Sequence, residues 1–206
     1  MRVLLLLPIL ATACSQQAVV GNNAVDINAA ADRAQHDVDS YAANDVAAAP
    51  PEPLRPAAPG RPGGLPDDKT PISEAPFAPD SPQGAAAVVQ TYYALIGEEK
   101  YAEAWKLWGD GGKASGQSAD AFAASFARYS EYHANIGAPG REDAGAGQRY
   151  ITVPVQSYAR MKDGKAAYWI GGVVLHRTAD IDGATAEDRK WRIKSIDLKA
   201  APPAAK

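Results

Sequence analysis

The chain has 206 residues, a formal net charge of −3 and a single cysteine. Its length allows one or two domains at roughly 100 to 200 residues each, but residues 14–80 have too few large apolar side chains to form a core, so we expect one domain. The lack of a basic excess argues against a nucleic-acid partner, because Lys and Arg are needed to neutralise a phosphate backbone. One cysteine also excludes an internal disulfide.

The N-terminus has the composition of an export signal. Met1-Arg2 supplies a positive charge, and residues 3–13 form an almost wholly apolar run. Such a run has the size of a signal-peptide core, about 7 to 15 residues, and is shorter than the roughly 20 needed to span a membrane. It ends in Leu10-Ala11-Thr12-Ala13-Cys14, which resembles the lipobox of bacterial lipoproteins, although that family more often has Leu where Ala11 stands. The resemblance implies cleavage of residues 1–13 and lipid attachment to Cys14.

Lipid attachment at Cys14 would make the bilayer the first partner of the chain. Ser15 follows the cysteine, in place of the Asp that resembles an inner-membrane retention signal. We therefore expect a lipid-anchored protein of the cell envelope, in the outer membrane and facing the periplasm. The alternative is an ordinary secretory signal, with Cys14 an incidental thiol.

Residues 14–80 are predicted to form a disordered tether. The stretch is rich in Ala, Pro, Asn and Asp, so it cannot bury enough apolar surface to offset the entropy of ordering it. Seven prolines between residues 50 and 66 favour an extended, polyproline-like spacer. One alternative stays open for residues 24–48, where apolar residues recur at spacings of four and three and could form one face of a helix.

From Ser81 the sequence shows helical periodicity. Ser81-Pro82 is a helix start signal, and apolar residues then recur at helical spacing as far as Gly97. Aromatic residues mark a second helix over 101–108, and a third begins after Ser118 and runs through Tyr129. We therefore expect three helices before any strand.

Beyond residue 132 the apolar period becomes two, which is typical of strands. Strands are predicted around 150–156, 168–177 and 191–198, with a two-residue type I′ turn at Asp163-Gly164 between the first two. That turn places Ile151 and Val153 opposite His176 and Val174, on the apolar side that packs on the helices. Gly171-Gly172 predicts a bend or bulge in the middle strand.

The expected fold is α+β: three helices packed on a bent antiparallel sheet of three to four strands, spanning residues 81–199. Residues 200–206 are predicted to be a disordered tail. Tyr92 and Trp105 are expected in the core, against Ile151, Val153, Val155 and Val174.

Three stretches of this domain resemble one family. They are 88–95 (VVQTYYAL), 101–107 (YAEAWKL) and 191–193 (WRI). Together they resemble the cone-shaped fold shared by nuclear transport factor 2 and ketosteroid isomerase, over roughly residues 82–198. The resemblance implies a pocket between the sheet and the long helix, and enzymes of this fold use Asp, Tyr or His there.

Candidate pocket residues follow from that implication. They are Tyr92, Trp105, Tyr158 and His176, and further polar candidates are His133, Asp120 and Asp197. His176 and Asp197 would form a base with its orienting acid, but the turn near Gly183 places His176 opposite Lys190 and leaves Asp197 some 20 Å along the strand. No motif indicates a catalytic residue, a metal site or a cofactor.

The sequence favours a non-enzymatic envelope lipoprotein whose domain binds an envelope protein or a small apolar ligand. One alternative is an isomerase or dehydratase acting in the cone. Another is a spacer that links membrane and cell wall, suggested by a lipid at one end and Lys206 at the other.

Overall fold

The computed structural model describes residues 27–44, 50–68 and 76–204. Cys14 and the predicted signal peptide therefore lie outside the described residues. The chain divides into two units, 1–50 and 51–206, and each is treated by itself.

In the first unit the structure describes one helix, α1, Ile27–Asn44. This helix lies within residues 24–48, the stretch for which a helix was the alternative to a disordered tether. Its described side chains are almost all exposed, Val38 included. Within the described ranges, no helix combines the length and the apolar character that crossing a membrane requires.

The second unit begins its regular structure with helices. α2, Pro82–Gly97, starts as predicted, and the Ser81 hydroxyl caps it by accepting a hydrogen bond from Gly84 N at 3.1 Å. The second predicted helix is shorter than expected: α3 covers only Tyr101–Trp105, and a 3₁₀ segment, η1, follows at Asp110–Ser115. α4, Ala119–Phe126, begins after Ser118 as predicted.

The prediction that this last helix runs through Tyr129 is wrong, because Tyr129 begins a strand. The strands are β1 Tyr129–Ile136, β2 Asp143–Gly145, β3 Gln148–Met161, β4 Ala166–Thr178 and β5 Arg192–Ala200. They form one antiparallel sheet in the order β1-β3-β4-β5, with β2 also paired to β3, so the sheet has five strands where three to four were expected.

The hairpin between β3 and β4 lies where it was predicted but has a different loop. Met161 N donates to Lys165 O, so three residues, 162–164, form the connection, and only Gly164 has a positive φ, +86°. This is the pattern of a type I turn followed by a left-handed glycine rather than a type I′ turn. The pairing shifts by one residue, so Ile151 faces Leu175 and Val153 faces Val173.

That shift corrects the predicted faces of β4. A one-residue change in register moves each side chain to the other side of a sheet. Val174 and His176 therefore lie on the outer face, which we define as the face turned away from α2–α4, while Val173 and Leu175 are buried. The expected packing of Val174 against Tyr92 and Trp105 is wrong for the same reason.

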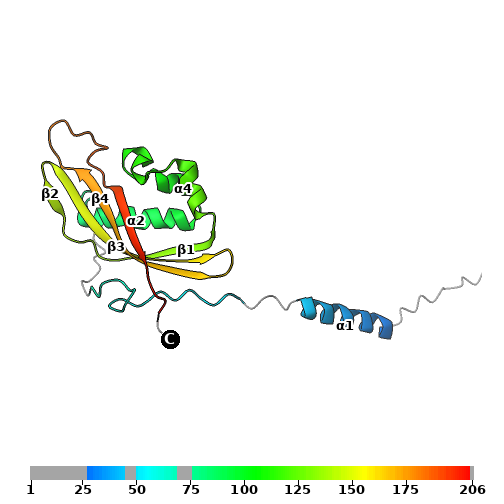
Figure 1. Cartoon of the computed structure of the whole chain (residues 1–206). Coiled ribbons are helices and arrows are strands. Elements are labelled where there is room, and N and C mark those ends of the chain that lie inside the picture. Colours follow the sequence, from blue (N-terminus) through cyan, green and yellow to red (C-terminus); the bar gives the residue numbers. More distant parts are fainter. Residues whose placement is uncertain (1–26, 45–49, 69–75, 205–206) are drawn as a thin grey trace, which may run out of the picture. The chain divides into compact units, whose positions relative to one another are not determined.

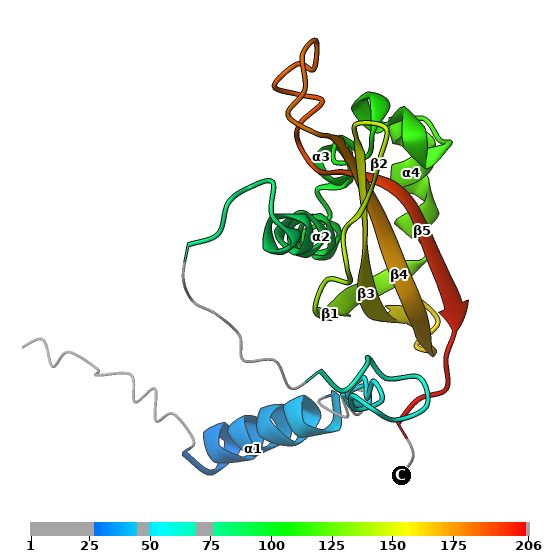
Figure 2. The same ribbon diagram turned by 90° about the vertical axis from the view of Figure 1, so that its left-hand side faces the viewer.

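The core lies between the other face of the sheet and the helices (Figure 2). As predicted, Ile151, Val153 and Val155 belong to it, each at most 2% exposed. The predicted bulge at Gly171-Gly172 is displaced, since the pairing with β5 shifts between Val174 and Leu175. Gly171 instead allows close strand contact, because an ideal Cβ there would lie 2.0 Å from Asp197 O.

Residues 51–68, which we call the strap, run along the outer side of the sheet, and Figure 1 shows them in cyan with the strands between them and the helices. The prediction of a disordered tether differs from the structure here, because Ala57 and Leu65 of the strap are buried, with 4% and 9% exposed. The expected disordered tail also differs, since Ala200 pairs with Trp169 and Ala201 N donates to Tyr168 O.

Candidate ligand-binding site

The space between sheet and helices, where the family resemblance places a pocket, is filled by side chains. Tyr92 is 3% exposed and meets Tyr93, Trp108 and Phe122 edge-on or tilted, with ring centroids 4.9 to 6.4 Å apart. Burial raises the pKa of Tyr92 well above its ordinary value. A cavity at one end of this layer measures about 30 Å³, which is the space of one water molecule.

The four predicted pocket residues do not come together. Tyr92 is in the core, and Trp105 is half-buried, with its Nε1 donating to Ser115 Oγ at 3.0 Å. Tyr158 lines a groove beside the strap, and His176 lines a separate cleft at the other end of the sheet.

The three other polar candidates are also apart. His133 is on β1 with its ring 5.4 Å from that of Tyr158, and Asp120 is exposed in the first turn of α4. Asp197 pairs with Gly172 while His176 pairs with Arg192, so His176 and Asp197 stay separated as predicted, although the partner of His176 is not Lys190.

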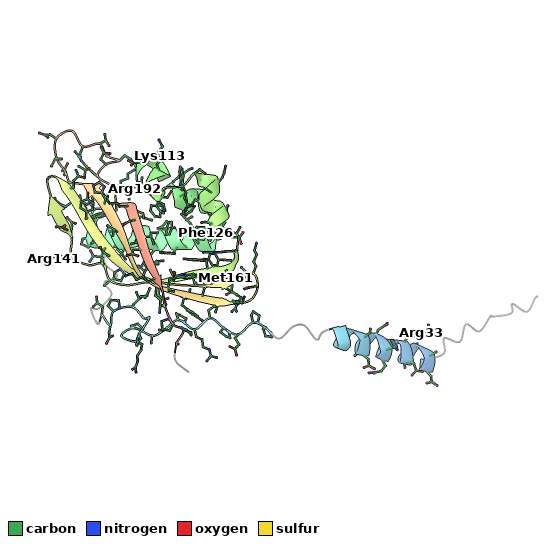
Figure 3. The ribbon with its side chains drawn as sticks, viewed as in Figure 1. Arg33, Lys113, Phe126, Arg141, Met161 and Arg192 are labelled. Carbon is green, nitrogen blue, oxygen red and sulfur yellow. The ribbon has the colours of Figure 1, made fainter. Side chains whose placement is uncertain are left out.

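The cleft at His176, which we call the loop cleft, has a volume of about 350 Å³. It lies among η1, the end of β4, the loop over 179–191 and the start of β5. Its lining is Gly109, Asp110, Gly111, Ala114, His176, Thr178, Glu187, Asp188, Lys190, Arg192, Ile193 and Lys194. Figure 3 shows Arg192 at the start of β5, near the helical turn that carries Lys113.

Main-chain pairing holds the two sides of the loop cleft together. Ile193 N donates to Leu107 O at 3.0 Å, and Gly109 N donates to Ile193 O at 2.9 Å. The next residue, Asp110, has φ +53°, a left-handed conformation that Asp and Asn adopt more readily than other residues with a side chain.

Glu187 organises the loop side of the cleft. It forms ion pairs with Arg192 and with Lys190, the latter at 2.8 Å. These hydrogen bonds lower the pKa of Glu187 to about 2. Asp188 accepts hydrogen bonds from the Thr185 hydroxyl and main-chain N–H, at 2.6 and 2.9 Å, so it is also ionised and fixed.

His176 shares the lining of the cleft with two opposite charges, Asp110 and Lys194, and the Lys194 ammonium lies over the Tyr150 ring, 5.8 Å from its centroid. Burial lowers the pKa of His176, the Lys194 charge lowers it further, and the Asp110 charge opposes both. No ion pair among the described residues joins Lys194 or Asp110 to another side chain. The ring also contacts Tyr150, with centroids 4.8 Å apart, and bonds to Gln148, so its position is defined.

The sequence named His176 but missed Asp110 and Lys194. The signal available was Gly109-Asp110-Gly111-Gly112, a run whose glycines allow the left-handed turn that places Asp110 at the cleft. Across the residues that the structure describes, no group of three or more His, Cys, Asp or Glu could hold a metal ion.

No protein-family model matches the chain, and no curated protein matches it. Among solved structures, the Kfla4162 protein from Kribbella flavida is similar to it with a TM-score of 0.41 and 14% sequence identity, over 60% of this chain and 93% of that one. A likeness at this level assigns neither family nor function. The chain's own elements define its class, an α+β domain with a five-stranded antiparallel sheet.

Proposed function

We propose that this chain is a lipid-anchored protein of the bacterial cell envelope whose domain binds a small zwitterionic ligand in the loop cleft. The anchor is Cys14, acylated after removal of residues 1–13, and its membrane is the outer membrane facing the periplasm. The domain is of the cone-shaped kind shared by nuclear transport factor 2 and ketosteroid isomerase. Support for the anchor and for the cone is the sequence resemblance described above.

One observation carries the ligand part of this proposal: Lys194, Asp110 and His176 line the same cleft. Among the other charges of the lining, Glu187 pairs with Lys190 and Arg192, and Asp188 accepts hydrogen bonds from Thr185. A ligand with one negative and one positive group can pair with Lys194 and Asp110, with the neutral His176 ring as a hydrogen-bonding partner between them.

The proposal replaces the small apolar ligand expected from sequence with a zwitterionic one. A small apolar ligand needs an apolar cavity, whereas the interior of the domain is packed by aromatic and aliphatic side chains. The loop cleft is the alternative location, and charged side chains dominate its lining.

NMR titration of the purified full chain tests the proposal. L-alanyl-L-alanine, a zwitterion, should shift the His176 side-chain resonances, while acetate and ethylamine, which carry one charge each, should not at the same concentration. Lys194→Ala and Asp110→Asn should each weaken dipeptide binding by about tenfold, the usual scale for losing one charged hydrogen bond. Asn tolerates the left-handed conformation at this position, so the backbone should be kept.

Lys199→Ala is the matched control, because Lys199 is an exposed lysine of the same strand that lines a different groove. It should leave binding unchanged. A His176 resonance that ignores the dipeptide, or a dipeptide affinity that neither Lys194→Ala nor Asp110→Asn reduces, would show that the loop cleft does not bind zwitterions.

A further inference from the structure

The strap is held on the outer face mainly through its main chain. Gln156 Nε2 donates to Ala57 O and to Gly63 O, both at 2.8 Å, and so bridges two parts of the strap. Arg160 Nη2 donates to Glu52 O at 2.6 Å. The face therefore presents two side-chain donors to carbonyl groups of an incoming polypeptide.

Contacts within the sheet orient both donors. Asn135 Nδ2 donates to Gln156 Oε1 at 2.9 Å, which turns the Gln156 amide nitrogen towards the strap. Arg160 Nε donates to Glu131 Oε1 at 2.7 Å, and this bond holds the pKa of Glu131 below its ordinary value. Because these partners belong to β1, the donors stay in place when the strap is absent.

The strap has the chemistry that such a face fits. Proline has no N–H group, so an extended proline-rich segment leaves its carbonyl groups without partners in its own chain. The strap carries Pro51, Pro53 and Pro56 in the stretch that crosses Arg160 and Tyr168. In this stretch Arg55 N donates a hydrogen bond to Tyr168 Oη at 3.0 Å.

Few strap side chains contribute to the contact. Ala57 and Leu65 are buried, whereas most other described residues of the strap are exposed or half-exposed. The face thus holds an extended stretch, residues 51–57, followed by a turn in which Gly60 N donates to Leu65 O and Gly64 N donates to Arg61 O. Holding the extended stretch takes its main chain and one small buried side chain, Ala57. Such a requirement is loose enough for other proline-rich sequences to meet it.

The strap also leaves part of the face unfilled. A groove of about 360 Å³ separates its first residues from the sheet, and it is lined by Pro51, Pro53, Leu54, Glu131, His133, Tyr158 and Arg160. Tyr158 and His133 form an aromatic wall, with ring centroids 5.4 Å apart. Aromatic walls are the usual seat for proline rings in polyproline recognition.

We propose that the outer face of the sheet is a binding site for an extended, proline-rich segment of a partner protein, and that the strap occupies this site in competition with it. The strap has the advantage of being covalently attached, which gives it an effective concentration on the order of millimolar. A partner segment gains by filling the groove at Tyr158 that the strap leaves open. This site is separate from the loop cleft, so the two proposals stand or fall independently.

Variants of the full chain that release the strap test this proposal. Leu65→Asp removes the aliphatic anchor of the strap without altering the sheet, and release is read from faster hydrogen exchange at the Arg55 amide. Two labelled peptides, decaproline and a copy of residues 51–68, should then bind roughly tenfold or more tightly than to the wild-type chain, measured by fluorescence anisotropy. Adding Gln156→Ala should remove that gain for both peptides.

Arg61→Ala is the matched control, since Arg61 is an exposed strap residue, and it should change neither exchange nor binding. If the peptide copying the strap binds and decaproline does not, the face reads its own strap alone and the proposal of a proline-rich partner is wrong. Dimerisation of Leu65→Asp in sedimentation experiments, without decaproline binding, would make a second copy the occupant. If Ala57→Asp combined with Leu65→Asp still leaves exchange slow at Arg55, the strap cannot be displaced, and the proposal is also overturned.

Discussion

Replacing Gly112 by Ala should destabilise the domain by about 3 kcal/mol, and most of that cost should vanish when Trp105 is also replaced. An ideal Cβ on Gly112 would lie 2.3 Å from Trp105 Cδ2 and 2.4 Å from Cε2. The indole ring cannot turn away freely, because its Nε1 donates to Ser115 Oγ at 3.0 Å and to Gln117 O at 3.1 Å.

Two costs add at this position. Overpacking of a fixed ring costs about 1 to 3 kcal/mol, and a side chain on a residue with positive φ costs roughly 1 to 2 kcal/mol. Gly112 has φ +101°, so both apply. In a Trp105→Ala background only the backbone cost remains, which predicts a coupling of about 2 kcal/mol between the two substitutions.

Gly111→Ala is the control for the backbone cost alone. Gly111 has φ +62°, and an ideal Cβ there meets nothing within 4 Å. Its effect should be about 1 to 2 kcal/mol with or without Trp105. Urea denaturation of the full chain measures all of these free energies, and additive effects of Gly112→Ala and Trp105→Ala would refute the proposed packing of η1.

Three further outcomes are expected. Cys14→Ser should abolish incorporation of labelled fatty acid and leave an uncleaved precursor, because the acyl chain needs the thiol; labelled fatty acid in that variant would exclude lipidation at this residue. Trp191→Ala should lower the free energy of unfolding by about 3 to 5 kcal/mol in urea denaturation. The reason is that Trp191 is 2% exposed, its ring lies under the Arg177 guanidinium, and its Nε1 donates to Ser81 O at 3.0 Å. A loss below ~1 kcal/mol would contradict its place in the core. The pKa of His176 is lower in the folded chain, so the unfolded chain takes up a proton at higher pH and the folded state loses stability as pH drops below about 6.5. His176→Gln should therefore lose less stability between pH 7.5 and pH 5 than the wild-type chain does. Equal losses would contradict a neutral His176.

Local signals predicted the elements whose formation depends on neighbours in sequence. Ser81-Pro82 marked the start of α2, because a hydroxyl cap and a proline in the first turn act within a few residues. Alternation over Ile151, Val153 and Val155 indicated the buried face of β3 for the same reason. β2 was missed because it has three exposed residues, Asp143–Gly145, and therefore shows no apolar alternation.

The strap escaped prediction because its contacts join residues far apart in sequence. Gln156 and Ala57 are 99 residues apart in sequence, and their hydrogen bond requires no apolar periodicity in either stretch. Composition correctly shows that residues 51–68 cannot form a core of their own. It does not show that the outer face of a sheet elsewhere in the chain offers donors to their carbonyl groups.

The location of His176 in the loop cleft could not be predicted, because it depends on whether the loop between β3 and β4 has two residues or three. Asp163-Gly164 is compatible with a two-residue loop, but the chain uses three residues, and the left-handed conformation is taken by Gly164 alone. Both loops satisfy the apolar pattern of β3, whereas β4 carries apolar residues on both faces around Val173 and Val174, so its pattern could not decide the register. With the observed loop, His176 lies on the outer face of the sheet and pairs with Arg192. There the charges of Lys194 and Asp110 shift the pKa of its ring in opposite directions. The choice of loop therefore places the one sequence-predicted histidine of the candidate pocket in the loop cleft rather than in the interior of the domain.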